Sequence, residues 1–212
     1  MSRPLIISDC DEVLLYMMAP FQAWLDEAHG VRLDMGASFE GSMSYRDGGA
    51  PVPGREIWRL LNLFFDSEMH RQTPVTGALE AVAGLREHAD IVVLTNLLDH
   101  RQEARTQQLA ALGADLRVFT NQGPKGPKLQ AILDEYRPSR AIFIDDLPQH
   151  HGSVAEIAPH VGRLHLCAEP MVAPHIACAH KAGHAHARID SWDKALPWLI
   201  ERLYADEKME NA

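Results

Sequence analysis

The sequence predicts an α/β fold: a Rossmann-like parallel sheet flanked by helices, with a small, mainly helical segment inserted after the first strand. Five short apolar runs, several of them rich in β-branched residues, are typical of strands that are buried on both faces. Helical patterns lie between them, and such alternation favours parallel strands joined by right-handed crossovers. A long stretch without a recognisable strand follows the first run and indicates the insertion.

The first strand is expected at Leu5-Ile6-Ile7, shortly before the acidic residues Asp9 and Asp11. Two carboxylates so close together repel each other, so both must face water or share a cation. Cys10, which lies between them, is interpreted as a small apolar core residue rather than a redox group. The acidic pair therefore suggests a metal site as a hypothesis. Polar residues at the ends of the later strands would support it.

The inserted segment contains two helical patterns around a loop that is rich in Gly and Pro. The patterns lie at 19–30 and 53–65, the loop lies at 40–54, and no strand is expected. Ligands bind at the carboxyl ends of the strands in an open parallel sheet, so an insertion that leaves from that edge would cover the site as a cap. The predicted domains are a core of residues 1–13 and 75–212 and a cap of residues 14–74.

The remaining chain supplies the other strands and the helices that cover the sheet. Strands are expected at 91–96, 116–121, 141–146 and 161–166. Helices are expected at 77–89, 98–113 and 123–136. The second of these helices ends on Gly113, which favours a C-terminal stop, and the third begins with Gly and Pro.

Charge and cysteine content argue against several classes of function. With 20 Lys and Arg against 29 Asp and Glu, the formal net charge is −9, so general binding to nucleic acid or to an anionic membrane is not expected. No apolar run approaches the roughly 20 residues that span a bilayer. The N-terminus carries no signal-peptide core and the three cysteines are unevenly spaced, which favours a cytoplasmic location.

Polar side chains follow three of the predicted strands and open one helix: Asp9 and Asp11, Thr95 and Asn96, Asp145 and Asp146, and Lys125 and Lys128. Taken singly, each is typical of a helix cap or a solvated side chain. In a parallel sheet all of them would gather at one edge. Clustered carboxylates favour Mg²⁺, which prefers oxygen ligands and often binds a substrate phosphate. A lysine, a hydroxyl group and a carboxylate nucleophile suit a phosphate monoester.

Four stretches in this order, SDCDEV, VVLTN, KGPKL and FIDD, resemble the four motifs of the haloacid dehalogenase (HAD) superfamily of phosphohydrolases. The motifs extend from residue 9 to residue 146, and the order of strands and helices fits as far as about residue 190. The resemblance implies a HAD-like core and a phosphatase that acts through an aspartyl-phosphate intermediate.

The resemblance also implies a role for each motif residue. Asp9 would be the nucleophile, and Asp11 would protonate the leaving oxygen and then act as base on the water that hydrolyses the intermediate. Thr95, helped by Asn96, would hydrogen-bond the transferring phosphoryl group. A lysine of the third motif would neutralise the phosphate charge and hold the nucleophile.

Carboxylates from two strand ends form the implied metal site. Mg²⁺ would be bound by Asp9, Asp145 and the backbone carbonyl of Asp11. Asp146 would be an outer ligand, acting through water or by fixing the lysine of the phosphate site.

The lysine of the phosphate site has two candidates. Lys125 fits the resemblance better, because a glycine and an apolar residue at position 129 follow it in the expected pattern. Lys128 lies three residues further on and can face the same side of a helix start, so it stays as the alternative.

These expectations combine into a Mg²⁺-dependent phosphomonoester hydrolase for a small phosphorylated metabolite. Asp11 supplies the proton that a poor leaving group needs, and a cap over the cleft would exclude large polymers. Three alternatives stay open: a phosphomutase with the same residues, a protein or nucleotide phosphatase, and a non-enzymatic metal-binding or interaction protein built on the histidine-rich segment 175–186. That segment could hold zinc or form a solvated loop.

The cap is expected to determine specificity. Tyr45, Arg46, Arg55 and Trp58 could contact a substrate, and Arg46 in the Gly-rich loop is the leading candidate for a specificity residue. Trp24, Trp58 and the apolar run 60–65 are interpreted as the cap's own core.

Overall fold

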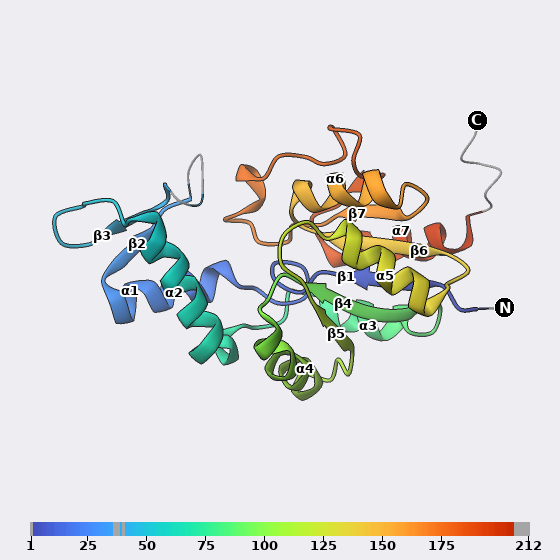
Figure 1. The fold of residues 1–212 in the computed structure, drawn as a ribbon, viewed down its shortest axis with the longest axis horizontal. Coiled ribbons are helices and arrows are strands. Elements are labelled where there is room, and N and C mark those ends of the chain that lie inside the picture. The colour runs from blue at the N-terminus through green and yellow to red at the C-terminus, as the bar shows by residue number, and fades with distance from the viewer. Residues whose placement is uncertain (1, 36–38, 40, 206–212) are drawn as a thin grey trace.

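The structure is a computed structural model, and it describes residues 2–35, 39 and 41–205. It confirms the α/β prediction, because a six-stranded parallel sheet with helices on both faces forms the larger part of the molecule (Figure 1). The strand order is β5-β4-β1-β6-β7-β8. The strands are β1 Leu5–Ser8, β4 Asp90–Thr95, β5 Arg117–Thr120, β6 Ala141–Asp145, β7 Gly162–His165 and β8 Ala187–Arg188.

The helices around the sheet agree with the predicted ones and add two more. They are α3 Ala78–Leu85, α4 Gln102–Ala111, α5 Gly126–Tyr136, α6 Pro148–Ile157 and α7 Trp192–Tyr204. Two 3₁₀ turns accompany them, η2 Asp99–Arg101 and η3 Ala173–His175. The helices α6 and α7 and the strand β8 were not predicted. Within the described ranges, no helix is long and apolar enough to cross a membrane.

The central strand β1 shows why the strands are continuous apolar runs. Its Leu5 and Ile7 side chains pack with α5 and α6 on one face of the sheet, and Ile6 packs with α3 and α7 on the other. Burial on both faces selects apolar residues at every position of such a strand. Because β1 pairs with β4 on one side and β6 on the other, the chain order reverses here. A crevice is expected at the carboxyl end of β1 for that reason.

The cap is mainly helical, but it also contains two strands. Its elements are α1 Met18–His29, β2 Val31–Leu33, β3 Met43–Tyr45, α2 Gly54–Ser67 and η1 Met69–Arg71. The strands β2 and β3 pair antiparallel, so the prediction that this segment has no strand was wrong. Each strand has three residues, too few for a two-residue alternation to stand out, and β3 lies within the Gly- and Pro-rich stretch.

The cap has an apolar core of its own. Phe21 and Phe64 meet edge to face with their ring centroids 5.3 Å apart, and Trp24 packs beside them. Trp24 is 4% exposed, as its interpretation as a core residue requires, whereas Trp58 is 48% exposed. The assignment of Trp58 to the cap core was therefore wrong: it lies on α2 but outside the buried face of that helix.

Two neighbouring stretches of chain connect the cap to the sheet. Tyr16 N donates a hydrogen bond to Thr73 O, and Val75 N donates one to Leu14 O, each at 2.9 Å. The two connecting stretches therefore lie side by side, and Figure 1 shows the cap to one side of the sheet. The predicted domain bounds stay a prediction. Residues 1 and 206–212 of the predicted core, residues 36–38 of the predicted cap, and Glu40 at the start of its loop lie outside the described residues.

The substitution Gly126→Ala is expected to lower the free energy of unfolding by about 1–3 kcal/mol. A Cβ added at Gly126 would lie 2.5 Å from the backbone oxygen of Ser153 in α6, so α5 and α6 would have to move apart. Gly152→Ala is the control, because a Cβ there would lie 3.4 Å from the His184 ring and alanine favours a helix. Urea unfolding measures both variants, and equal stabilities would contradict this close contact of α5 with α6.

Candidate active site

A buried lysine connects two carboxylates at the carboxyl edge of the sheet. Lys125 Nζ lies 2.8 Å from Asp9 Oδ2 and 2.7 Å from Asp145 Oδ2. Asp9 follows β1, Asp145 ends β6, and Lys125 stands directly before α5. Burial opposes the charge of Lys125, but the two carboxylates outweigh it and raise the pKa of the ammonium group. Lys128 takes another direction, with its Nζ over the Phe119 ring at 5.9 Å from the centroid.

Asp9, Asp145 and Asp146 together can hold a divalent cation. Each offers an oxygen within 4.8 Å of the others, and the part of the chain that the structure describes contains no other such group of three acidic, His or Cys ligands. Burial, partly opposed by the Lys125 charge, raises the pKa of Asp9 to about 7. Burial and the charges of Asp145 and Asp9 also raise the pKa of Asp146. Crowded negative charge and hard oxygen donors fit Mg²⁺, which would offset this repulsion.

Asp11 has a different set of partners. Its Oδ1 accepts hydrogen bonds from Gln72 Nε2 at 2.7 Å and from Arg105 Nη2 at 3.0 Å. Arg105 is fully buried, and its Nη1 also donates to the sulfur of Cys10 at 2.7 Å. Burial raises the pKa of Cys10 to about 12, which fits its interpretation as a core residue. Asp11 is therefore held both by a helix of the core and by the chain that returns from the cap.

Sequence reasoning missed Arg105 and Gln72. Arg105 lies four residues before Leu109 on α4, and both belong to the buried side of that helix. A basic residue within the apolar stripe of an amphipathic helix is the signal that could have identified it. Gln72 directly follows η1 and gives no such signal, because a single glutamine at a helix end belongs to no pattern.

Thr95 and Asn96 come from the end of β4. Thr95 is buried, and its hydroxyl group lies 3.5 Å from Asp11 Oδ2, so it faces the carboxylates. Asn96 instead fixes the loop before α5: its Nδ2 donates to Gly123 O at 3.0 Å, and its Oδ1 accepts from Asn121 Nδ2 at 2.9 Å. The structure thus brings Thr95 to the carboxylates and places Asn96 at the edge of the site.

Two buried histidines contact the backbone of the metal-site carboxylates. His151 Nε2 lies 3.0 Å from Asp145 O, and His165 Nε2 lies 2.7 Å from Asp146 O. Burial lowers the pKa of His151 to about 4 and also lowers that of His165. Both rings are therefore neutral at pH 7 and act as hydrogen-bonding supports.

Acidification is expected to destabilise the wild type more than the variant His151→Leu. The pKa of His151 is about 4 in the folded state against the ordinary histidine value of 6.5, so the unfolded state binds more protons between these values. The stability contributed by the neutral ring is complete above pH 6.5 and is lost as the pH falls to 4, on the order of 3 kcal/mol. Urea unfolding in EDTA at several pH values measures both slopes, and equal slopes would contradict this role of His151.

The histidine-rich segment 175–186 uses its rings in contacts with the backbone. His186 Nδ1 accepts the N–H of Arg163 at 3.0 Å, and His180 Nδ1 lies 3.0 Å from Ala185 O. Among the described residues, this segment contributes to no group of three metal ligands. The geometry therefore gives the zinc alternative no support.

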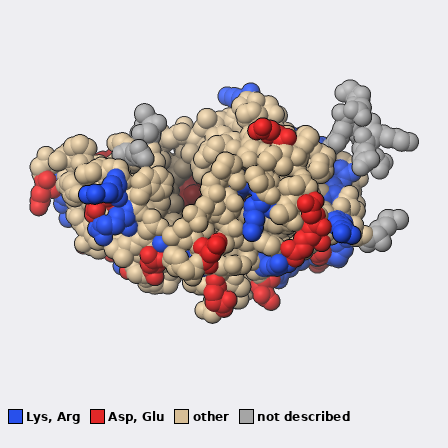
Figure 2. Space-filling view, in the orientation of Figure 1, with Lys and Arg blue, Asp and Glu red and all other residues tan. Residues whose placement is uncertain are grey.

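A cavity of about 620 Å³ lies between the cap and the core, beside Asp9. Asp9, Asp11 and Asp146 line it from the core, and Trp58 and Leu61 of α2 line it from the cap. Figure 2 shows a hollow between these two parts of the molecule, with acidic atoms inside it. A ligand in this space would reach the carboxylates directly.

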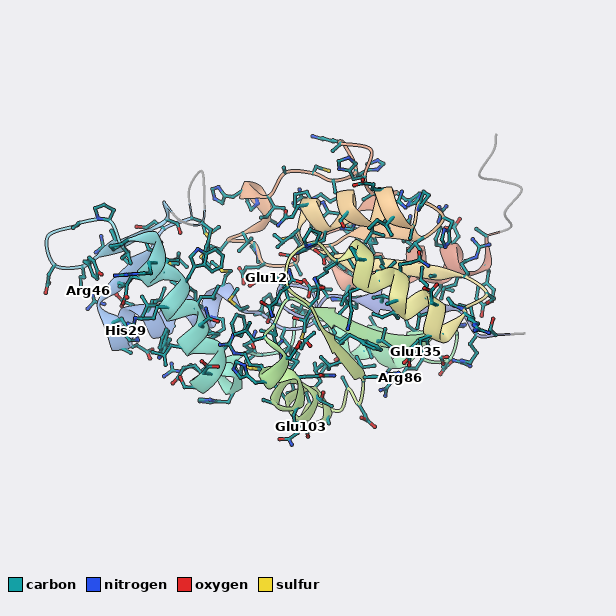
Figure 3. All side chains as sticks on the ribbon, in the orientation of Figure 1. Glu12, His29, Arg46, Arg86, Glu103 and Glu135 are labelled. Carbon is teal, nitrogen blue, oxygen red and sulfur yellow. The ribbon has the colours of Figure 1, made fainter. Side chains whose placement is uncertain are left out.

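Arg46 does not reach this cavity. Its guanidinium group pairs with Asp26, and its backbone N–H donates to Gly30 O at 2.7 Å. Figure 3 shows Arg46 at the far end of the cap, well away from Glu12 at the cavity. The prediction that Arg46 determines specificity was wrong, because its loop folds back onto the end of α1 instead of toward the sheet.

Glu12 is a further residue at this site that sequence reasoning missed. It has a left-handed backbone conformation, with φ of 61°, and is 3% exposed. Its Oε1 accepts the N–H groups of Met17 at 2.9 Å and Met18 at 2.5 Å, while its buried Oε2 has no hydrogen-bond partner among the described residues. Burial raises the pKa of Glu12 to about 7. Glu12 therefore accepts hydrogen bonds from backbone N–H groups at the start of α1, which have no partner within the helix. It also adds a fourth carboxyl group to the cavity.

The parallel sheet with its reversal at β1 and the inserted cap define an α/β architecture with its candidate site between the sheet edge and the cap. Comparisons with known proteins extend this description. No family model matches the sequence, and no curated protein matches it. Solved structures do match it, over nearly the whole chain.

Three of these structures show the extent of the similarity. A haloacid dehalogenase-like hydrolase from Streptococcus pneumoniae has a TM-score of 0.67 and 10% identity, over 93% of this chain and 98% of that chain. A HAD family hydrolase from Deinococcus radiodurans, with bound phosphate and sodium, has a TM-score of 0.65 and 19% identity, over 94% and 96%. The HAD-hydrolase YfnB from Bacillus subtilis, bound to magnesium, has a TM-score of 0.60 and 14% identity, over 93% and 98%. The chain therefore has the haloacid dehalogenase-like fold, which confirms the fold that the resemblance implies.

Proposed function

We propose that the protein is a Mg²⁺-dependent phosphomonoester hydrolase that acts on a small phosphorylated substrate through an aspartyl-phosphate intermediate on Asp9. The observation that carries this proposal is the buried contact of Lys125 with Asp9 and Asp145, beside a cavity at the crevice of the sheet. With Asp146, the three carboxylates exceed the single lysine charge, as a site for a cation requires. Structures of this fold with bound phosphate or magnesium agree with it.

Each side chain of the site has a separate role in the proposed reaction. A carboxylate oxygen of Asp9 attacks phosphorus, and Asp11 donates a proton to the leaving oxygen, so the alcohol departs neutral. The Asp11 carboxylate then takes a proton from a water molecule that attacks the phosphorus, which releases phosphate and restores Asp9. The ammonium group of Lys125 and the hydroxyl group of Thr95 stabilise the phosphoryl oxygens. Arg105 keeps Asp11 in position beside the reacting group.

The metal site is proposed to use the clustered carboxylates. Asp9, Asp145 and Asp146 would hold Mg²⁺ together with the backbone carbonyl of Asp11. When bound, the ion supplies positive charge to the phosphoryl oxygens. A cytoplasmic location is part of the proposal, since all three cysteines of the chain are free thiols.

Phosphate release from a panel of small phosphate esters tests the proposal. The wild type is expected to release phosphate with Mg²⁺, to lose this activity in EDTA and to recover it when Mg²⁺ is restored. Asp11→Asn should lower the rate by about 10²–10⁴-fold, because the leaving group is no longer protonated. Failure of the wild type to release phosphate from any ester would contradict the proposal. An isomerised sugar phosphate without free phosphate would identify the phosphomutase instead.

A further inference from the structure

We propose that the cavity selects phosphate esters whose alcohol is apolar and carries no second anionic group, such as 3-phenylpropyl phosphate. The inference rests on the proposed function for the phosphoryl end of the ester and adds the chemical class of the leaving group. Three observations carry it: the apolar walls of the cavity, the sign of the charges that line it, and an aromatic side chain left exposed beside it.

The walls of the cavity are apolar on both sides. Met17 and Met18 of the α1 start and Leu61 and Phe65 of α2 line it from the cap, and Val172 lines it from the core. An apolar group that displaces water from such walls binds in proportion to the area that it buries, and methionines adapt their shape to it. The volume of about 620 Å³ is within the range of roughly 300–1,000 Å³ for pockets that enclose small ligands. A ring on a short linker therefore fits.

The charged side chains that line the cavity are all acidic in the described part of the chain: Asp9, Asp11, Glu12 and Asp146. None of the described lining residues is a lysine or an arginine. Three of these acids belong to the proposed phosphoryl and metal site, so a carboxylate or a second phosphate at the distal end of the leaving group would lose its water against the apolar walls and gain no cation as partner. Such substrates should therefore be rejected.

Two buried arginines, Arg101 and Arg105, form ion pairs with other residues and do not line the cavity. Arg101 is 5% exposed and pairs with Asp66 at 2.7 Å. Arg105 is fully buried and pairs with Asp11 at 3.0 Å. Neither residue lines the cavity, so neither offers its charge to the distal end of a substrate.

Trp58 supports the inference independently. Its side chain is 48% exposed, although it is large and aromatic, and it lines the cavity together with Phe39, whose ring centroid lies 6.0 Å away. An exposed aromatic surface beside an apolar cavity is typical of a site that a ligand covers. Tyr45, on the same cap and 36% exposed, is not among the residues that line the cavity and provides a matched control.

Binding of two phosphonates that cannot be hydrolysed tests the inference. 4-Phenylbutylphosphonate and 4-carboxybutylphosphonate share the phosphoryl end and the linker and differ only at the distal group. Isothermal titration calorimetry on the wild type with Mg²⁺ should show that the phenyl compound binds at least about 10-fold more tightly. Equal binding, or tighter binding of the carboxyl compound, would overturn the inference.

Three variants locate the preference in the cavity. Leu61→Arg adds the missing cation, and it should lower the ratio of phenyl to carboxyl affinity by at least about 10-fold. Trp58→Ala should weaken binding of the phenyl compound by about 10-fold and leave the carboxyl compound unchanged. Tyr45→Ala should leave both affinities unchanged. An unaltered ratio in both Leu61→Arg and Trp58→Ala would overturn the inference.

Phosphate release from the matching esters, 3-phenylpropyl phosphate and 3-carboxypropyl phosphate, separates this inference from the proposed function. Both esters release a primary alcohol, so their intrinsic reactivity is alike. Hydrolysis of both at equal rates would overturn the inference and leave the proposed function intact. A preference for the phenyl phosphonate without hydrolysis of any ester would support the inference about the cavity and contradict the proposed function.

Discussion

Phosphate release by Asp9→Asn is expected to fall by at least about 10⁴-fold. The amide of asparagine does not attack phosphorus, so the proposed covalent step on residue 9 is lost. The rate is measured with Mg²⁺ and the ester that the wild type hydrolyses fastest.

The Asp9→Asn variant should stay folded, since the amide has nearly the size of the carboxylate and Lys125 retains Asp145 as a partner. Circular dichroism and a thermal melt check this. Asp115→Asn is the matched control, because it changes an exposed aspartate in the loop before β5 and should keep the wild-type rate. A rate for Asp9→Asn within about tenfold of the wild type would rule out its role as nucleophile.

Lys125→Met is expected to lose both stability and activity. The ammonium group is fully buried between Asp9 and Asp145, and removal of one partner from such an ion pair costs about 3–5 kcal/mol. Urea unfolding measures this loss. Added Mg²⁺ should restore part of the stability, because it binds the folded site and replaces the missing positive charge. Phosphate release should fall by about 10²-fold or more, since the developing charge loses a fixed cation.

Lys128→Met provides the control for this prediction. Lys128 belongs to the same helix, but its ammonium group lies over the Phe119 ring, at 5.9 Å from the centroid. Loss of this contact should cost no more than about 1 kcal/mol and leave phosphate release unchanged. A larger loss of activity in Lys128→Met than in Lys125→Met would show that Lys128 is the lysine of the phosphate site.

The sheet could be predicted because burial on both faces leaves a strong signal. The run 141–146, for example, contains only apolar residues before its two aspartates, and it forms β6. By contrast, β8 has two residues, and β2 and β3 have three each, so no period can develop. The helix α7 contains Pro197, a residue that normally argues against a helix interior.

The motif residues of the site could be located because topology fixes where strand ends meet. Asp9 and Asp145 follow or end neighbouring parallel strands, so their proximity follows once the strand order is known. Arg105 and Glu12 could not be located in this way. Arg105 reaches Asp11 from a helix whose rotation depends on packing, and Glu12 contacts the start of α1 through an uncommon left-handed backbone conformation.

The specificity of the site was the least predictable part. The cavity forms only when α1 and α2 are placed over the sheet edge, and that placement depends on contacts between segments far apart in the chain. Arg46 and Trp58 illustrate this, because the sequence alone favours the charged residue as the contact to the substrate. In the structure Arg46 pairs with Asp26, and Trp58 lines the cavity.

Chemical trapping shows which residue carries the phosphoryl group, which is proposed to be Asp9. Asp11→Asn is mixed with Mg²⁺ and 4-nitrophenyl phosphate, whose leaving group needs no proton, and is then quenched in acid and reduced with borohydride. Borohydride converts an aspartyl phosphate to homoserine, which peptide mass spectrometry can locate. If Asp9 is the nucleophile, homoserine is expected at position 9. Homoserine at another position, or release of phosphate without any homoserine, would contradict it.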